Sequence, residues 1–263
     1  MNLITNILKL LKVDFVERIQ KGDKKMKYMG SKNRLSKELV PIIQSYIDNM
    51  PNCNGYLEPF VEGANVIDKI KCENKYGSDI HKELIAFLTA LSNGYKPPFH
   101  ITEEEYKYMK EHQDEFDDVI KGYVGFQLSY GAKWFDTFRR DKIGKRKYDE
   151  EAYRNVMKQA PNLQGIVFNC CDFRDIKDIE NFVIYCDIPY KDTAKYSTKD
   201  FPYEEFYKWC KKMSKNNIVL VSEYNMPEDF KCVWEKDYKC LIYSKKEAND
   251  SKNNRTEKLF ICK

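Results

Sequence analysis

Residues 182–191 read Phe-Val-Ile-Tyr-Cys-Asp-Ile-Pro-Tyr-Lys, an apolar run that ends in an acid, a proline and an aromatic residue. A continuous run of this kind is typical of a parallel strand that is buried on both faces of its sheet. In parallel α/β sheets, ligands bind beyond the carboxyl ends of the strands, which is where Asp187 and Tyr190 are expected. The stretch therefore predicts an α/β fold with a ligand site at the tip of this strand.

Similar apolar runs predict further strands on both sides of this stretch, at residues 55–60, 76–79, 165–169, 218–222, 230–234 and 258–262. Helical patterns separate them at residues 36–49, 80–92, 151–158 and 203–215. The alternation predicts a three-layer domain with a mostly parallel sheet.

No strand pattern occurs between about residues 93 and 160, which predicts a mainly helical insert in a domain formed by residues 26–92 and 161–263. Residues 1–25 carry apolar side chains at helical spacing and predict an amphipathic extension. No run of about 18 uncharged apolar residues occurs, so we expect no membrane-spanning helix.

Charged residues of the same sign cluster along the chain, although 45 Lys and Arg against 41 Asp and Glu leave a net charge of only +4. Residues 103–118 are acidic, whereas residues 1–34, 121–147 and 231–263 are basic. The small total excludes a histone-like polybasic chain. The blocks are either solvated faces or basic patches that meet on a polyanion.

The cysteine pattern favours structural thiols. The nine cysteines form no CxxC pair and the chain has only three histidines, so no zinc-ligand spacing occurs and we expect no metal. Most of the cysteines lie in apolar runs, where a thiol behaves as a small buried hydrophobe. This pattern predicts a reducing, cytoplasmic setting.

Three further motifs precede the Asp187–Tyr190 tetrapeptide. They are Lys27-Tyr-Met-Gly-Ser-Lys32, Tyr56-Leu-Glu-Pro-Phe-Val-Glu-Gly63 and Tyr76-Gly-Ser-Asp79. An acid that closes the second strand binds ribose hydroxyls in dinucleotide-type sites. In this order, the four motifs make the chain similar to the Dam-type DNA adenine-N6 methyltransferases, especially those of phages and prophages, from about Met26 to Lys263.

The resemblance implies a Rossmann-like fold that uses S-adenosylmethionine (SAM), with residues 93–160 as a target-recognition subdomain. It implies double-stranded DNA as partner, a restriction-modification role and a phage-encoded enzyme in bacterial cytoplasm. The implied cofactor contacts are Tyr28, Lys32, Glu58, Pro59, Phe60, Gly63, Asp79 and Asp187. The implied catalytic tetrapeptide is Asp187, Ile188, Pro189 and Tyr190. The implied DNA contacts are Lys133, Arg139, Arg140 and Lys142, with Lys32 or Arg34 as further candidates.

Two positions depart from the family pattern. The family usually has F-x-G-x-G after the first strand, whereas Glu62 and Ala64 fill the two glycine positions here. Glycine at such positions permits a positive φ and a close backbone approach. Glu62 either repels the cofactor's carboxylate or attracts its ammonium or sulfonium. Ile188 replaces a proline of the usual D-P-P-Y, which keeps the backbone carbonyl and removes some rigidity.

The tetrapeptide suits methyl transfer to an exocyclic amine. A base inside a duplex cannot reach such a pocket, so the target adenine has to be flipped out and stacked, with Tyr190 as the stacking residue. Tyr196 is either a second pocket residue or a surface aromatic. Methylation of cytosine at carbon 5 requires a cysteine nucleophile in a Pro-Cys pair, and no such pair occurs in the sequence. The P-loop and GxGxxG motifs of ATP- and NAD-binding proteins are also absent from the sequence.

Two alternatives remain open from the sequence. One is a catalytically impaired methyltransferase fold that binds DNA or a protein partner without turnover, which Glu62 motivates. The other is methylation of RNA or of a free nucleotide in the same pocket, because a single sequence does not show whether a protein recognises the 2′-hydroxyl that distinguishes RNA from DNA.

Overall fold

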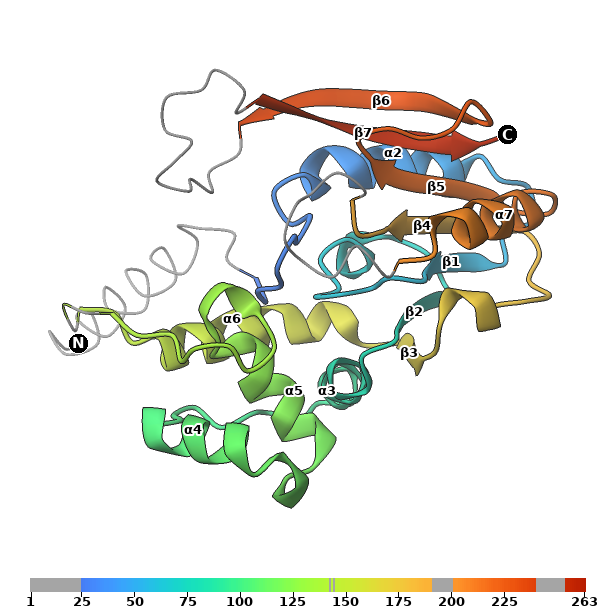
Figure 1. Cartoon of the computed structure of the whole chain (residues 1–263). Helices are drawn as coiled ribbons and strands as arrows, with labels where there is room; N and C mark the ends of the chain where they lie inside the picture. Colours follow the sequence, from blue (N-terminus) through green and yellow to red (C-terminus); the bar gives the residue numbers. More distant parts are fainter. Residues whose placement is uncertain (1–24, 142, 144, 191–200, 240–253) are drawn as a thin grey trace, which may run out of the picture.

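A seven-stranded sheet with the order β3-β2-β1-β4-β5-β7-β6 forms the centre of the computed structural model (Figure 1). The structure describes residues 25–141, 143, 145–190, 201–239 and 254–263. The parallel strands are β1 (Gly55–Glu58), β2 (Lys75–Asp79), β3 (Ile166–Cys170), β4 (Phe182–Asp187) and β5 (Ile218–Glu223). The antiparallel strands β6 (Phe230–Lys239) and β7 (Asn254–Cys262) complete it. This topology is that of Rossmann-like methyltransferases, as predicted.

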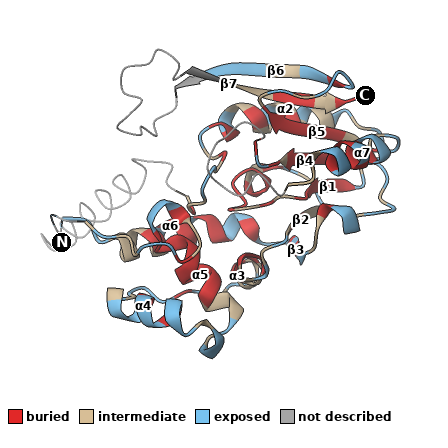
Figure 2. Ribbon diagram, viewed as in Figure 1, coloured by how far each residue is buried: buried red, intermediate tan, exposed pale blue. Residues whose placement is uncertain are grey.

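The strands alternate their side chains between two hydrophobic cores. Tyr56, Tyr185 and Leu259 face one core, whereas Ile184 and Val221 face the other. Because both faces are covered at the centre of the sheet, β1, β4 and β5 are buried along most of their length (Figure 2). The edge strand β3 instead alternates buried and exposed residues over its first three positions.

Helices cover both faces. The first core receives α2 (Ser36–Asp48), α3 (Lys82–Ser92), α5 (Asp118–Gln127) and α6 (Tyr148–Leu163). The second receives α7 (Tyr203–Met213) and the 3₁₀ turn η4 (Phe173–Asp175). In α2 the buried positions 39, 43 and 47 recur every four residues, which places one apolar stripe against the sheet. The predicted strands and helices are thus present, with α6 longer at both ends than expected.

The predicted insert holds α4 (Glu103–Glu111), α5 and most of α6, with the turns η2 (Gln113–Glu115) and η3 (Tyr130–Ala132). A further 3₁₀ turn, η1 (Ile67–Lys69), contacts α6, and α5 packs on α3. The helix α6 runs across the predicted boundary at residues 160 and 161, so the limits of the insert remain a prediction. None of the helices in the described part of the chain has both the length and the apolar character needed to cross a membrane.

The predicted amphipathic helix at residues 1–25 lies outside the described residues, apart from Lys25. Lys142 and Tyr196 lie outside them as well. The eight cysteines of the described residues are all free thiols. Cys186, Cys210 and Cys262 are buried as predicted, whereas three others are half-buried and two are exposed, so buried thiols are fewer than the apolar runs suggested.

Candidate active site

The carboxyl ends of the five parallel strands form an acidic edge of the sheet. Glu58, Asp79, Asp187 and Glu223 are the last residues of β1, β2, β4 and β5, and Asp172 follows β3 by two residues. Parallel strands end at the same edge, so these carboxyl groups gather where the sequence predicts the ligand site. Such an edge is suited to a ligand that carries positive charge.

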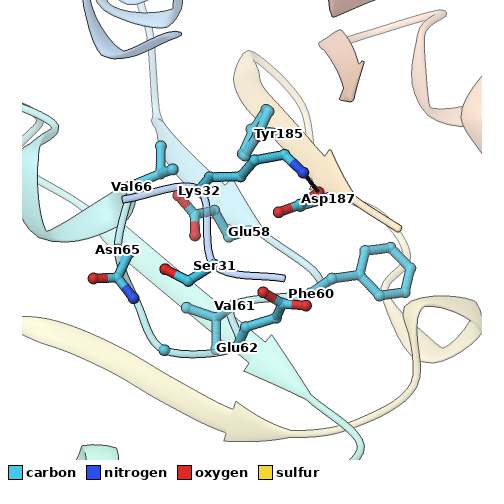
Figure 3. A pocket seen from close by; sticks show the side chains of 11 residues that line it. Ser31, Lys32, Glu58, Phe60, Val61, Glu62, Asn65, Val66, Tyr185 and Asp187 are labelled. Atoms are coloured by element: carbon cyan, nitrogen blue, oxygen red, sulfur yellow. Dashed lines mark ion pairs between the residues drawn. The ribbon is translucent and has the colours of Figure 1, made fainter. Parts of the chain in front are cut away.

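A pocket opens at this edge (Figure 3). It is lined by the segment before α2, by the turn after β1 and by the end of β4, and so joins three of the four sequence motifs. Its lining residues are Ser31, Lys32, Glu58, Phe60, Val61, Glu62, Gly63, Asn65, Val66, Tyr185 and Asp187.

The turn after β1 has a backbone shape that ordinarily calls for glycine. Glu62 has φ +46° and Ala64 has φ +53°, both in the left-handed region. These are the two positions where the related family usually has glycine. At Gly63, an added Cβ would lie 2.7 Å from the Asn65 Nδ2 atom and 3.0 Å from the Tyr28 Cβ atom, so this close approach requires glycine.

A buried glutamine of α6 holds the same turn in place. The Gln159 side-chain amide donates to the carbonyl oxygens of Gly63 and Ala64, at 3.0 Å each. Its oxygen accepts from the Met26 backbone N–H at 3.0 Å. These bonds tie the N-terminal motif, the turn and α6 together, and they fix the floor of the pocket.

At the tip of β4, four side chains form a connected cluster. The Lys32 ammonium lies 3.0 Å from Asp187 Oδ1, 3.9 Å from Glu257 Oε2 and 4.3 Å from the centre of the Tyr190 ring. The Tyr190 hydroxyl donates to Glu257 Oε2 at 2.7 Å. Burial opposes the charge on Lys32, but Asp187 and Glu257 outweigh it and raise the pKa of Lys32. Lys32 is therefore an ammonium ion in this cluster.

The two central residues of the tetrapeptide differ in burial. Ile188 is buried, whereas Pro189 is exposed. The Tyr203 hydroxyl at the start of α7 donates to the Pro189 carbonyl oxygen at 2.8 Å. The loop after β4 is thus anchored from the α7 side.

The acids of the pocket hold protons more tightly than exposed acids do. Burial raises the pKa of Glu58 to about 8, with the negative charge of Asp187 adding to the shift. Burial, together with Asp187, also raises the pKa of Glu62 well above its usual range. For Asp187 and Asp79, burial again raises the pKa. A cation that enters the pocket would favour the ionised forms of these groups.

This donor set fits a cationic, amine-bearing cofactor. Asn65 Oδ1 is buried and has no hydrogen-bond partner among the described residues. It lines the pocket together with the carboxyl groups of Glu58 and Glu62, and the glycine cradle at Gly63 allows close approach. Asp79 accepts from the backbone N–H groups of His81 at 3.0 Å and of Glu62 at 3.3 Å, which joins the acid of β2 to the turn.

Aromatic rings link this edge to the predicted insert. The Tyr28 ring lies 5.3 Å from that of Phe126, and the His81 ring lies 4.8 Å from Phe126 and 4.5 Å from Trp134. Burial raises the pKa of Tyr28, with Asp79 and Glu62 adding to the shift, so its hydroxyl stays neutral. The insert therefore packs directly beside the acid that closes β2.

The predicted DNA contacts have different surroundings. Arg139 is half-buried, lies 3.9 Å from the centre of the Tyr148 ring and pairs with Glu151 at 3.4 Å. Arg140 is exposed and pairs with Glu103 at 3.2 Å. Lys133 is half-buried in the loop after η3. Of these three, Arg140 offers the most accessible charge.

Three site residues were missed by the sequence analysis: Asn65, Gln159 and Glu257. Glu257 and Leu259 are two residues apart in β7, so strand parity places Glu257 on the face of the first core. That parity is a signal in the sequence, but it carries no information about the partner strand. Asn65 directly follows the glycine turn, whereas nothing in the local sequence marks Gln159.

Sequence comparisons relate the chain to adenine-specific DNA methyltransferases. Residues 28–133 match the family model described as D12 class N6 adenine-specific DNA methyltransferase. The chain is 23% identical over 206 residues to "Type II methyltransferase M.CviBI" of Paramecium bursaria Chlorella virus NC1A, with 73% of this chain and 76% of that protein covered. A solved structure from Thermoplasma acidophilum, provisionally assigned as a methyltransferase, aligns with a TM-score of 0.24 and 13% identity. That alignment covers 43% of this chain and about half of the other, 54%. Among the described residues, no group of three or more His, Cys, Asp or Glu side chains is arranged to hold a metal ion.

Proposed function

We propose that this chain is a D12-class N6 adenine-specific DNA methyltransferase and that it transfers a methyl group from SAM to N6 of an adenine held at Asp187. The observation that carries the assignment to these residues is the single pocket that joins the end of β4 to the turn after β1. A methyl donor in the turn and an acceptor amine at Asp187 would then be neighbours. SAM, when bound, supplies an electrophilic methyl group on a sulfonium.

Asp187 and the Ile188 backbone carbonyl activate the acceptor. N6 of adenine is a weak nucleophile because its lone pair is delocalised into the ring. Hydrogen bonds from the amino group to the Asp187 carboxylate and to the Ile188 carbonyl oxygen localise that pair. These residues work by position and charge, and no covalent bond to the protein is needed.

Tyr190 provides the surface on which the flipped base stacks. Its hydroxyl is held by Glu257 at 2.7 Å, which fixes the orientation of the ring. The Lys32 ammonium now donates to Asp187 and lies over the Tyr190 ring, so it occupies the place that the base requires. On entry of the base, Lys32 turns away from Asp187, and Glu257 at 3.9 Å is its nearest alternative partner.

Tyr28, Phe60 and Gly63 shape the cofactor side of the pocket, Glu58 lies at its floor and Asp79 receives the ribose hydroxyls. Pro59 keeps the turn that follows β1 stiff. The duplex is contacted by Arg140, Lys133 and Lys142, and the phosphates of double-stranded DNA supply the complementary charge. Arg139, held by Glu151 and Tyr148, supports this surface from within the fold. Residues 93–160 form the recognition subdomain.

The biological setting that we propose is modification of DNA by a phage-borne enzyme in the cytoplasm of a bacterial host. The viral relative named as a Type II methyltransferase supports a restriction-modification context. The catalytically impaired alternative predicts DNA binding without turnover.

The test is transfer of a radiolabelled methyl group from SAM to mixed-sequence duplex DNA. Asp187→Ala is expected to abolish labelling, and the isosteric Asp187→Asn to reduce kcat by about a hundredfold or more. The control is Asp229→Asn, which removes an exposed carboxylate that pairs with Lys211 of α7 and does not line the pocket. A folded wild-type protein that binds duplex DNA and labels none of it would favour the impaired alternative.

A further inference from the structure

Glu62 is a charged residue in a backbone conformation that disfavours it. Its φ of +46° lies in the left-handed region, which costs a non-glycine residue about 1–3 kcal/mol. Such strain persists where the surrounding structure imposes it, and it concentrates at functional sites. Ala64 has φ +53° in the same turn, so the turn tolerates side chains at both positions. Only Glu62 brings a charge.

The Glu62 carboxylate faces the pocket without a partner among the described residues. Figure 3 shows it projecting from the turn into the space that also receives Glu58 and Asp187. Its backbone N–H donates to Asp79 Oδ2 at 3.3 Å, which holds the residue beside the acid of β2. The cation of the pocket, Lys32, is already engaged by Asp187 at 3.0 Å. An ionised Glu62 therefore needs a positive charge from a ligand.

Methyl transfer determines which charge that ligand presents at Glu62. The sulfur that carries the methyl group has to lie within reach of the amine held at Asp187. Glu62 and Asp187 line the same pocket, and Figure 3 shows the Glu62 carboxylate directed from the turn toward the end of β4, where Asp187 lies. The sulfonium has to enter the same part of the pocket, whereas the ammonium and carboxylate of the cofactor lie further from the acceptor.

We infer that Glu62 is a specificity residue that recognises the positive sulfonium of SAM and so discriminates it from the product S-adenosylhomocysteine, whose sulfur is neutral. The inference rests on the proposed use of this pocket for SAM. Both molecules carry the same ammonium and carboxylate, so only a group near the sulfur can tell them apart by charge. Weak retention of the neutral product would free the pocket after each turnover.

The experiment is calorimetric titration of the full-length wild type, Glu62→Gln, Glu62→Gly and Ala64→Gly with SAM and with S-adenosylhomocysteine. Glu62→Gln is expected to weaken SAM binding by roughly tenfold and to leave product binding within about twofold, because it removes the charge and keeps the shape. Glu62→Gly is expected to lose the same discrimination while raising the melting temperature, since glycine relieves the strained φ. Ala64→Gly relieves similar strain without a charge change and should preserve the ratio of the two affinities.

A kinetic measurement separates this role from a general structural one. Positive charge leaves the sulfur during transfer, so Glu62 stabilises bound SAM more than the transition state. Glu62→Gln is expected to raise KM for SAM while kcat stays unchanged or rises, because bound SAM loses more stabilisation than the transition state does. Equal weakening of SAM and of the product, or tighter SAM binding by Glu62→Gln, would overturn the inference. Failure of the folded wild type to bind either molecule would instead overturn the proposed cofactor pocket, and the inference with it.

Discussion

At the scale of single residues, the candidate site is defined by carboxyl groups that the fold itself buries. Glu58 illustrates this, because it is 3% exposed and accepts a hydrogen bond from the Tyr56 hydroxyl at 2.7 Å. Burial disfavours its ionised form in the folded chain but not in the unfolded chain. The titration of Glu58 is therefore coupled to stability.

We predict that Glu58 makes the folded state lose stability as the pH rises from about 4.5 to about 8. The folded state binds this proton more tightly, so the contribution is complete below the lower value and is lost as pH rises through the upper one. Chemical denaturation across this pH window should show that the free energy of unfolding of the wild type declines, and that it declines less in Glu58→Gln. Exposed Glu73→Gln is the control, and parallel curves for wild type and Glu58→Gln would contradict the prediction.

Gln159 provides a second residue-scale prediction, because it makes three hydrogen bonds from a fully buried position. Gln159→Leu leaves two carbonyl groups and one N–H without these partners. We expect the free energy of unfolding to fall by about 1–3 kcal/mol, as measured by denaturation. We also expect the affinity for SAM to fall, as measured by calorimetry. Asn155→Ala on the same helix is the control, since the Asn155 amide nitrogen is buried without a partner among the described residues and should cost less.

At the scale of elements, the contact between α3 and α5 joins the predicted insert to the sheet. Gly122 allows it, since an added Cβ would lie 2.1 Å from the Glu83 carbonyl oxygen and 2.8 Å from the Phe87 Cβ atom. Backbone atoms of a packed helix cannot move aside without shifting the helix. The glycine thus sets the distance between the two helices.

We predict that Gly122→Ala lowers the free energy of unfolding by about 1–3 kcal/mol, although alanine is the better helix former by about 1 kcal/mol. The comparison variant is Gly94→Ala, where nothing lies within 4 Å of the added Cβ and only the positive φ of +88° matters. Denaturation curves measure the free energy of unfolding of both variants. An unchanged or higher stability of Gly122→Ala would show that the helices are not in close contact here.

At the scale of the whole molecule, charge is arranged so that the acidic strand edge and the basic part of the insert lie on one chain of small net charge, +4. The total is uninformative because the opposite charges lie in different places. Arg139 is tied to Glu151 and Tyr148 inside the fold, whereas Arg140 is exposed beside Glu103. The two neighbouring arginines therefore have different expected effects.

We predict that Arg140→Ala reduces the salt dependence of duplex DNA binding by about one unit of log–log slope, because one phosphate contact is lost. Arg139→Ala should chiefly lower the melting temperature, because it removes a stacked ion pair. Fluorescence anisotropy at several salt concentrations measures the slope, and thermal unfolding measures the second effect. An unchanged slope for Arg140→Ala would place the duplex elsewhere on the surface.

Strand and helix positions could be predicted from the sequence because apolar periodicity reports local burial directly. The end of β4 and the site at its tip follow from the same signal, since Asp187 ends an apolar run. The family motifs named the residues of the site but not their contacts. Glu257 and Gln159 could not be predicted, because their partners lie 67 residues and more than 90 residues away.

The chain's local pattern was sufficient for the α/β class, the mostly parallel sheet and the acids at its edge, because each depends on neighbours within a few residues. The tertiary structure alone decided that Lys32 pairs with Asp187 and lies over the Tyr190 ring, that Gln159 holds the turn after β1, and that Glu62 keeps a left-handed backbone beside the pocket. These features depend on how distant segments pack, and packing distances between such segments are not encoded in the spacing of residues along the chain.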